Sequence, residues 1–320
     1  MTGGYRAEPV TDPVVAAQAV ALRRRVFVEG QGVPAGLEYD GLDEAAEHVV
    51  VRDAAGVVVA TGRLLAEGGR ARLGRICSAP EVRGTGAGAA LLAGLERAAL
   101  LRGLPRGVLH AQRSAAEFYA RAGWTATGEP DVEAGIEHVW MTKDLLPGLR
   151  EATDADADAL QRLIGACWSE YPNCILDVDA EEPWLRAPAT AVAGYGGALW
   201  VVAPDGGPLV ASVAVRPAAP GDRVTAELKS LYVGAPARRH GWGAALVGLA
   251  RRWAADAGFV AVELWTDSRF ADAHRLYERL GFTFTGGSRE LHDLSGTTEF
   301  HATAPPLPGR AWRWPDPVPA

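Results

Sequence analysis

The sequence predicts two mixed α/β domains in tandem, and two repeated motifs support this expectation. The motif Arg-x-x-Gly-x-Gly occurs at Arg83–Gly88 and again at Arg238–Gly243, 155 positions apart, each time before an apolar helical segment. The stretches "FYARAGW" and "LYERLGF" follow in the same order, with Tyr119 and Tyr277 158 positions apart. Two motifs that recur in register indicate a duplicated domain. A chain of 320 residues, 48% of them hydrophobic, is long enough for two such cores.

Composition and charge narrow the class of protein. The net charge of −7 argues against general nucleic-acid binding, so any phosphate contact must be local. The sequence has no apolar run long enough for a membrane span, and its N-terminus lacks the layout of a signal peptide. Cys77, Cys167 and Cys174 are too few and too irregularly spaced for a disulfide framework or a zinc site. We therefore expect a cytoplasmic protein with reduced thiols, no metal and no membrane association.

The first copy is expected to run strand, strand, strand, helix, strand, helix. Apolar runs predict strands at residues 48–51, 57–65 and 72–78, with the turn "RDAAG" between the first two. The Gly-rich loop then opens a helix that ends at Gly103, where a left-handed C-cap residue is expected. A strand at 107–111 precedes the helix of "FYARAGW", which ends on a glycine followed by an aromatic residue.

The second copy repeats this order. Strands at residues 198–203 and 208–215 flank "PDGG", in which Asp-Gly tolerates the positive φ of a hairpin turn. A long strand at 224–233 leads to the second Gly-rich loop, and the helix that follows ends at Gly258. A strand at 260–266 and the helix of "LYERLGF" complete the copy.

Pro147-Gly148 is the predicted break between the copies, and Thr153 or Asp154 is expected to cap the next helix. The predicted domains are residues 1–147 and 148–302, followed by a Pro/Trp-rich tail at 303–320. The tail cannot form a core helix or a central strand, because proline lacks the amide hydrogen. Trp312 and Trp314 indicate that the tail docks against a surface.

The two Gly-rich loops predict anion-binding sites. A glycine-rich turn at a helix N-terminus exposes backbone N–H groups at the positive end of the helix dipole, and glycine permits close approach of a ligand. A tight turn that needs small residues is the alternative for either loop alone. The chain lacks the Gly-Lys-Ser/Thr ending of a P-loop. "GTGAGA" satisfies the dinucleotide pattern, but no ribose-binding acidic residue follows at the right distance, and Leu246 breaks the pattern in the second copy.

Both halves of the chain resemble the GNAT N-acetyltransferase superfamily. Its acyl-CoA signature, Arg/Gln-x-x-Gly-x-Gly/Ala, matches both Gly-rich loops, and its later Tyr-containing helix matches residues 118–124 and 276–282. The first half is similar to the ElaA-like branch in "GRICSAPEVRG" and "GIEHVWMTKDL". The resemblance implies a mixed sheet opened between its fourth and fifth strands, with pantetheine in the opening like an added strand.

The resemblance also implies acetyl-CoA, or another acyl-CoA, as cosubstrate, and two sets of binding residues. In the first copy the set is Ile76, Cys77, Ser78, Arg83, Gly84, Thr85, Gly86, Ala87 and Gly88. In the second copy the set is Leu231, Tyr232, Val233, Arg238, Arg239, His240, Gly241, Trp242 and Gly243. The stretches "RLGRICS" and "AELKSLYV" would provide the edges of the fourth strands, and the loop amides would hold the pyrophosphate.

Acetyl transfer to an amine needs a base, because an alkyl amine with a pKa of about 10 is mostly protonated at neutral pH. Glu227 lies 11 positions before Arg238 on the fourth strand, a place that matches the general base of some superfamily members. A strand-edge carboxylate paired to Lys229 is the alternative interpretation of Glu227.

The reaction also needs an oxyanion donor, and it is helped by an acid that protonates the departing thiolate. Tyr277 and Tyr119 match the tyrosine that gives this proton in many superfamily members, where a buried aromatic with a satisfied hydroxyl is the alternative. The backbone amide near Tyr232 or Val233 is the expected oxyanion donor. Because only the second copy has a carboxylate on the fourth strand, we expect it to carry the main catalysis.

The first copy departs from this pattern at Arg72, which stands where the second copy has its carboxylate. A base in the first copy must therefore come from elsewhere, and the candidates are Glu29, Glu47, His48 and His110. A structural hydrogen bond is the simpler interpretation of each histidine.

The second copy departs in one place, since Phe270 stands where many members have an asparagine seven residues before the tyrosine. This change affects the expected pantetheine contacts of that helix. The acidic stretches "LEYDGLDEAAE" and "LDVDAEE" are interpreted as solvated loops, with an acceptor entrance as the alternative.

The leading hypothesis is an acyl-CoA-dependent N-acyltransferase, in the first instance an N-acetyltransferase. It would acylate an amine of a small molecule or a peptide terminus by direct attack of that amine on the thioester. Two alternatives stay open: the donor is a carrier-protein thioester or a charged tRNA, or one copy, in particular the first, is a non-catalytic scaffold or acyl-CoA sensor. The chain is expected to act as a monomer, in which the domains form a pseudo-dimer, or as a homodimer.

Overall fold

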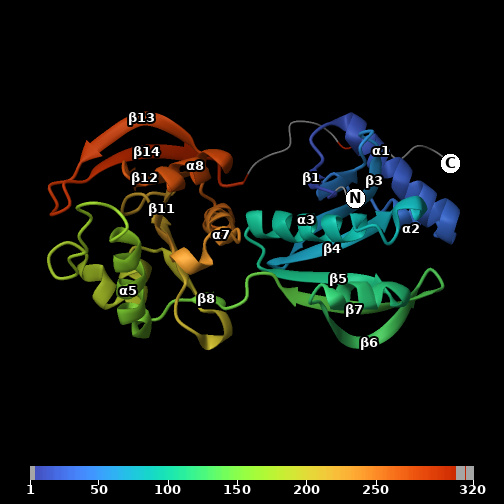
Figure 1. Cartoon of the computed structure of the whole chain (residues 1–320), viewed down its shortest axis with the longest axis horizontal. Helices are drawn as coiled ribbons and strands as arrows, with labels where there is room; N and C mark the ends of the chain where they lie inside the picture. Colours follow the sequence, from blue (N-terminus) through green and yellow to red (C-terminus); the bar gives the residue numbers. More distant parts are fainter. Residues whose placement is uncertain (1–3, 308–313, 315–320) are drawn as a thin grey trace. The chain divides into compact units, whose positions relative to one another are not determined.

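The computed structural model describes residues 4–307 and residue 314, and these divide into two compact units (Figure 1). The first unit contains most of the chain up to Leu145 together with Trp314, and the second contains most of residues 146–307. Trp312 of the predicted tail lies outside the described residues. The limits that the sequence predicts for the two domains stay a prediction.

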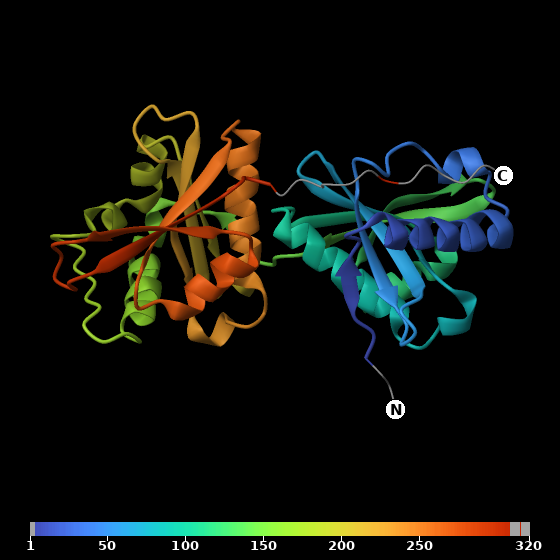
Figure 2. The same ribbon diagram turned by 90° about the horizontal axis from the view of Figure 1, so that it is seen from above.

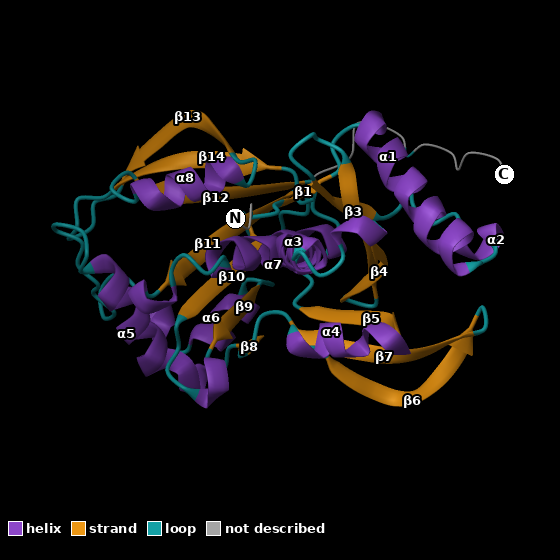
Figure 3. Cartoon of the chain, turned by 45° about the vertical axis from the view of Figure 1, so that its right-hand side comes forward, coloured by secondary structure: helices purple, strands orange, loops and turns teal. Residues whose placement is uncertain are grey.

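The first unit is a seven-stranded mixed sheet with helices on both faces (Figure 3). Its strands are β1 (Ala7–Pro9), β2 (Glu47–Arg52), β3 (Val58–Glu67), β4 (Arg70–Ser78), β5 (Arg106–Gln112), β6 (Thr125–Glu133) and β7 (Ile136–Asp144). Its α-helices are α1 (Pro13–Arg23), α2 (Ala35–Glu38), α3 (Ala87–Leu101) and α4 (Ala116–Arg121), and a π-helical segment, Arg24–Glu29, extends α1.

The second unit repeats this architecture. Its strands are β8 (Leu149–Glu151), β9 (Ala198–Val202), β10 (Ala211–Pro217), β11 (Thr225–Val233), β12 (Ala261–Asp267), β13 (Thr283–Glu290) and β14 (Thr298–Ala304). Its α-helices are α5 (Ala157–Trp168), α6 (Pro188–Gly194), α7 (Trp242–Asp256) and α8 (Ala271–Arg279).

The two sheets share one topology. The strand order is β1-β2-β3-β4-β5-β7-β6 in the first and β8-β9-β10-β11-β12-β14-β13 in the second. In each sheet only the fourth and fifth strands run parallel, and the other neighbours are antiparallel. The mixed α/β class and the duplication predicted from the sequence are therefore confirmed.

Helices cover both faces of each sheet because successive residues of a strand point to opposite sides (Figure 2). Val49 of β2 lies against α3, where a Cβ added to Gly94 would come within 3.0 Å of the valine side chain. Val50, the next residue, packs in the cluster that α1 forms on the other face. In the second unit Val213 packs in the cluster that includes α7, and Ala214 packs with residues of α5 and α6.

The predicted turn and cap signals are found at element ends. Gly103 and Gly258, just after α3 and α7, have φ values of 68° and 86°, as a left-handed cap requires. Asp205 in "PDGG" also has a positive φ, 53°, and it lies between the antiparallel strands β9 and β10. Thr153, rather than Asp154, is the N-cap residue, and it forms a capping box with Asp156.

Trp314 docks in the first unit, as the sequence predicts for the tail. Its side chain is 7% exposed and belongs to the cluster around α1 that also contains Cys77. The indole stacks on the imidazole of His48, with ring centroids 3.5 Å apart, and the Trp314 amide donates to a carboxylate oxygen of Glu44 at 2.6 Å. A residue near the C-terminus therefore completes the core of the N-terminal domain.

We expect Trp314→Ala to lower the free energy of unfolding of the first domain by about 3 kcal/mol, because it removes a large buried side chain and leaves a cavity. Chemical denaturation followed by circular dichroism measures this change. Val132→Ala is the control, because Val132 is 71% exposed on β6. Equal stability of the Trp314 and Val132 variants would contradict a structural role of the tail.

Candidate active sites

The fourth and fifth strands of each sheet are paired over only three residues and then separate. In the first domain, β4 and β5 pair from Ala71↔Gly107 to Leu73↔Leu109. In the second, β11 and β12 pair from Thr225↔Ala261 to Glu227↔Glu263. Within the described residues, the later part of β4 has no ladder partner on β5, and β11 has none on β12. Each domain therefore has an unpaired strand edge at the predicted place, and this edge can accept an extended ligand.

A β-bulge bends the fourth strand beside each opening. Arg75 and Ser230, 155 positions apart, have φ values of 53° and 51°, and the ladder to the third strand shifts register at both places. This conformation costs a non-glycine residue about 1–2 kcal/mol. The Arg75 guanidinium offsets the cost by donating to the carbonyl oxygens of Leu37 (2.6 Å) and Glu38 (3.0 Å), and the Ser230 carbonyl oxygen accepts from Ser212 Oγ at 3.0 Å. Neither bulge was predicted from the sequence, where the only available signal is that Arg75 and Ser230 have the same spacing as the Gly-rich loops.

The first Gly-rich loop presents unpaired backbone donors. Gly84 and Gly86 have φ values of 77° and 99°, and α3 begins at the next residue, Ala87. In the described part of the chain, the amide N–H groups of residues 86–89 have no hydrogen-bond acceptor, whereas the Ala90 amide donates to the Gly86 carbonyl oxygen. Four such donors at the positive end of a fifteen-residue helix can bind an anion.

The second loop has the same geometry. Arg239 and Gly241 take φ values of 70° and 83°, and the amide N–H groups of residues 241–244 have no acceptor among the described residues. The Arg238 side chain, however, is engaged within the protein. Its guanidinium donates to both carboxylate oxygens of Glu170, at 2.6 and 2.7 Å, and to the carbonyl oxygen of Val233 at 2.8 Å. The backbone, more than the Arg238 charge, is therefore available to an anion here.

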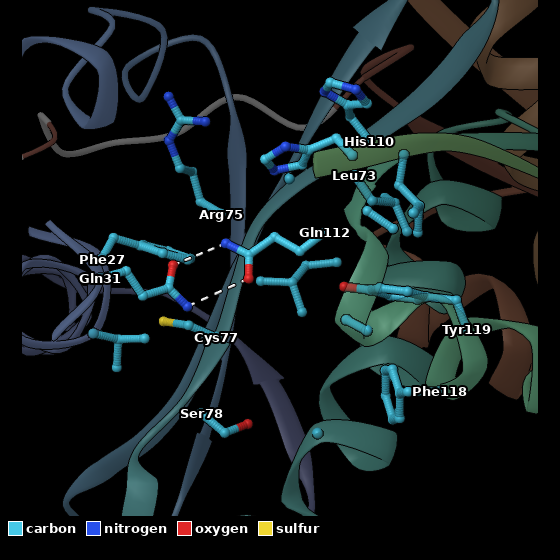
Figure 4. A pocket seen from close by; sticks show the side chains of 18 of the residues that line it. Phe27, Gln31, Leu73, Arg75, Cys77, Ser78, His110, Gln112, Phe118 and Tyr119 are labelled. Atoms are coloured by element: carbon cyan, nitrogen blue, oxygen red, sulfur yellow. Dashed lines mark hydrogen bonds between the residues drawn. The ribbon is translucent and has the colours of Figure 1, made fainter. Parts of the chain in front are cut away.

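A cavity of about 740 Å³ lies in the first domain, between the separated strands, the Gly-rich loop and α4 (Figure 4). The predicted residues that line it are Ile76, Cys77, Ser78, Arg83, Gly84, Gly86, Gly88 and Tyr119. Thr85 and Ala87 are not among the lining residues. The side chains of Gln31 and Gln112 are joined by two hydrogen bonds, at 2.8 and 3.4 Å, and link the segment after α1 to the end of β5.

Tyr119 and Cys77 are two buried titratable groups that line this cavity. Burial raises the pKa of the Tyr119 phenol above its ordinary value, so the hydroxyl keeps its proton at neutral pH. Figure 4 shows this hydroxyl pointing toward β4. Burial also raises the pKa of the Cys77 thiol to about 12, which excludes a thiolate nucleophile at that position. Tyr277, the counterpart in the second domain, is 6% exposed, and burial raises its pKa as well.

Glu227 is buried, and cations contact both of its oxygens. Arg216 donates to Oε2 through Nε at 3.0 Å and through Nη2 at 2.9 Å, and Lys229 donates to Oε1 at 3.3 Å. The Lys229 pair that the sequence offered as an alternative is present, and the Arg216 pair was not predicted. A substrate that gives its proton to Glu227 would therefore have to compete with both cations for the carboxylate oxygens.

Four other predicted residues of the second site have local partners. Leu231 and Trp242 pack against the core of the domain. The Tyr232 hydroxyl accepts a hydrogen bond from Trp168 Nε1 at 3.0 Å, and burial raises the pKa of its phenol. His240 Nδ1 lies 3.4 Å from the carbonyl oxygen of Ala237.

The structure separates the four base candidates of the first domain. His110 lines the cavity, whereas Glu29, Glu47 and His48 are not among its lining residues. Glu29 forms an exposed ion pair with Arg24 at 3.1 Å. His48 is buried, with Nε2 3.0 Å from the carbonyl oxygen of Asp43. Only His110 among the four is therefore placed to meet a substrate.

A buried network of charges borders the same cavity. It joins the guanidinium groups of Arg23, Arg63 and Arg75 to the carboxylates of Glu38, Asp40 and Asp43. The prediction that "LEYDGLDEAAE" is a solvated loop is wrong for Glu38 and Asp43, which are 2% and 9% exposed. Burial raises the pKa of Glu38 despite its two arginines. For Asp43, hydrogen bonds from Arg23 and Arg63 outweigh burial and lower the pKa.

Among the described residues, no three His, Cys, Asp or Glu side chains are placed together so that they could hold a metal ion. None of the described helices has the length and apolar character needed to cross a membrane. All three cysteines are free thiols.

Comparison with known proteins gives two matches to family models and several relatives. Residues 15–145 match a model described as "Acetyltransferase (GNAT) domain", and residues 159–282 match one described as "Acetyltransferase (GNAT) family". The uncharacterised N-acetyltransferase YjcF of Bacillus subtilis is 39% identical over 127 residues, which cover 39% of this chain and 90% of YjcF.

Two solved structures are also similar to parts of the chain. An acyl-CoA N-acyltransferase from Pseudomonas aeruginosa is 28% identical; the match covers 44% of this chain and 99% of that protein, with a TM-score of 0.40. Escherichia coli ElaA is 21% identical; the match covers 44% of this chain and 99% of that protein, with a TM-score of 0.39.

Proposed function

Because the chain belongs to the GNAT acetyltransferase family, with two domains of that family in tandem, we propose that it transfers an acetyl group from acetyl-CoA to an amine. The acceptor is an amine of a small molecule or of a peptide terminus, and the reaction takes place in the cytoplasm. The cavity of the first domain is the observation that carries this proposal. It joins a free strand edge, an anion-binding loop and a protonated tyrosine in one space.

These residues fit an acyl-CoA. The four free amides of residues 86–89 match a pyrophosphate, and the positive φ of Gly86 lets that group approach the backbone closely. The unpaired edge of β4 offers backbone groups to the amides of a pantetheine arm. Bound acetyl-CoA supplies a thioester whose carbonyl carbon accepts the amine.

The side chains of the cavity then have defined tasks. Tyr119 donates its hydroxyl proton toward the sulfur on which negative charge collects as the C–S bond breaks. The second domain offers Tyr277 for the same task. We keep Glu227 as its proposed base, although Arg216 and Lys229 contact both carboxylate oxygens.

Isothermal titration calorimetry of the full chain with acetyl-CoA tests this proposal. We expect two binding sites per chain, because both loops present four free amides. One site would restrict the proposal to a single domain and make the other a scaffold. No binding would overturn acetyl-CoA as donor and favour a carrier-protein thioester or a charged tRNA.

A further inference from the structure

A histidine and a carboxylate that no motif accounts for face each other at the wall of the first cavity. His110 is the first residue of β5 beyond its last pair with β4, Leu73↔Leu109, and it lines the cavity. Glu133, the last residue of β6, lines the same cavity. The His110 side chain is 15% exposed and that of Glu133 is 58% exposed, so a ligand can reach the pair.

The hydrogen bond to Asp131 determines which ring nitrogen of His110 carries its first proton. His110 Nε2 lies 2.9 Å from Asp131 Oδ1, and since a carboxylate accepts only, Nε2 must donate. The ring is held in place by stacking on Trp140, with centroids 4.4 Å apart, and by His138 at 4.7 Å. The other nitrogen, Nδ1, therefore holds the lone pair of the neutral imidazole.

His110 Nδ1 points at a second acceptor. Nδ1 lies 3.3 Å from Glu133 Oε2. In the neutral imidazole, the lone pair of Nδ1 therefore faces a carboxylate oxygen, and the two repel each other unless a proton lies between them. A donor with several N–H groups satisfies both at once. An alkylammonium ion is such a donor, because its three N–H bonds can reach the nitrogen and the oxygen together while its charge is balanced by the carboxylate.

We propose that His110 Nδ1 and Glu133 form the acceptor subsite of the first domain, which takes the protonated primary amine of an alkylammonium substrate. This assignment rests on the acetyl-CoA function proposed above. The bound ammonium, paired with Glu133, gives one proton to Nδ1, and Asp131 accepts a hydrogen bond from Nε2 of the imidazolium that results.

Every bond and proton of the acetyl transfer is then accounted for. The freed amine nitrogen forms the C–N bond at the thioester carbonyl carbon as the C–S bond breaks. A second proton of that nitrogen ends on the departing sulfur, and His110 returns the first proton to solvent. Two further charged or titratable groups lie on this side of the ring: His138, with its ring centroid 4.7 Å from that of His110, and Arg72, whose guanidinium lies 5.7 Å from the Trp140 ring centroid.

Comparing two kinds of nucleophile tests whether His110 acts as a base or has only a structural role. n-Butylamine, tyramine and putrescine are ammonium ions at neutral pH, whereas hydroxylamine is already unprotonated and needs no base. With an accepted alkylamine, we expect His110→Gln to lower kcat/KM by about 10²-fold or more. Transfer to hydroxylamine should stay near the wild-type rate.

Substitutions of Glu133 and Asp131 should change different kinetic parameters. Glu133→Gln should raise the KM for the alkylamine by about fivefold at little cost in kcat, since the exposed pair contributes up to about 1 kcal/mol. Asp131→Ala should lower kcat/KM and Asp131→Asn should restore much of it, because an amide oxygen still accepts from Nε2. Glu129→Gln is the control, since it removes an exposed charge from the same strand.

Calorimetry of acetyl-CoA binding to the wild-type chain and to each variant distinguishes failure of the proposed function from failure of the subsite alone. If the wild-type chain does not bind acetyl-CoA, the proposed function fails and the subsite fails with it. If it binds, the subsite alone is overturned when His110→Gln slows both nucleophiles equally. It is also overturned when the wild-type chain acetylates hydroxylamine but none of the three alkylamines.

Discussion

Replacing Tyr119 with phenylalanine is expected to lower kcat for acetyl transfer by about 10²-fold while leaving the affinity for acetyl-CoA unchanged. Only the hydroxyl is lost, and the ring keeps its place under the cavity. Because burial raises the pKa of this phenol, the hydroxyl keeps its proton at neutral pH. The protonated hydroxyl can donate a hydrogen bond to the negative charge that collects on the sulfur. Steady-state kinetics with hydroxylamine as acceptor measures this effect without involving a base.

Tyr277→Phe and Glu227→Gln show how the work is divided between the domains. If the first domain carries turnover, both substitutions should change kcat much less than Tyr119→Phe. The sequence alone led us to expect the reverse, with the second domain as the main catalyst. A large loss of kcat in Tyr277→Phe and Glu227→Gln, together with near wild-type activity of Tyr119→Phe, would restore that expectation and make the first domain the scaffold.

The repeat explains why so much of the fold could be predicted. The Gly-rich loops and the later tyrosines recur at nearly equal offsets, 155 and 158 positions, so each copy supported the interpretation of the other. Strand patterns and glycine caps then placed the elements, because alternation and positive φ are properties of short stretches. The opening between the fourth and fifth strands, implied by the resemblance, is present in both sheets, between β4 and β5 and between β11 and β12.

What the sequence analysis missed depends on contacts between distant residues. Arg75 and Ser230 are bulge residues because the neighbouring strand and loop stabilise them, and neither is a residue type that favours a positive φ. Glu170 lies 68 positions before Arg238, so no motif connects the two. Glu38 belongs to an acidic stretch that local composition assigns to solvent, yet arginines from other elements bury it.

The base of the first domain also could not be chosen from the sequence, because the choice depends on contacts between distant residues. The sequence offered four candidates with no means of choosing, because cavity lining is decided by which strand residue follows the last β4–β5 pair. The geometry selects His110 and adds Glu133 and Asp131, which come from a strand that no motif marked.

The second large effect is expected from substitutions in the two Gly-rich loops, which should weaken the binding of acetyl-CoA. We expect Gly86→Val and Gly241→Val each to weaken acetyl-CoA binding at their own domain by at least about tenfold. Both glycines have a positive φ, 99° and 83°, which a β-branched residue strongly disfavours. A change of this backbone turns the free amides of residues 86–89 or 241–244 away from a shared anion position.

Space inside the folded protein is not the reason for this effect, since a Cβ at either position meets no atom within 4 Å. The loss should therefore appear in ligand binding, over and above a modest loss of stability from φ alone. Gly56→Val and Gly221→Val are matched controls: their φ values are 82° and 79°, their Cβ positions are equally open, and neither belongs to a Gly-rich loop. If these controls weaken acetyl-CoA binding as much as Gly86→Val and Gly241→Val, strain explains the loss and the loops are not pyrophosphate sites. If only the loop variants lose binding, and each removes one of the two sites seen by calorimetry, both copies of the duplicated loop hold a pyrophosphate through their backbone amides.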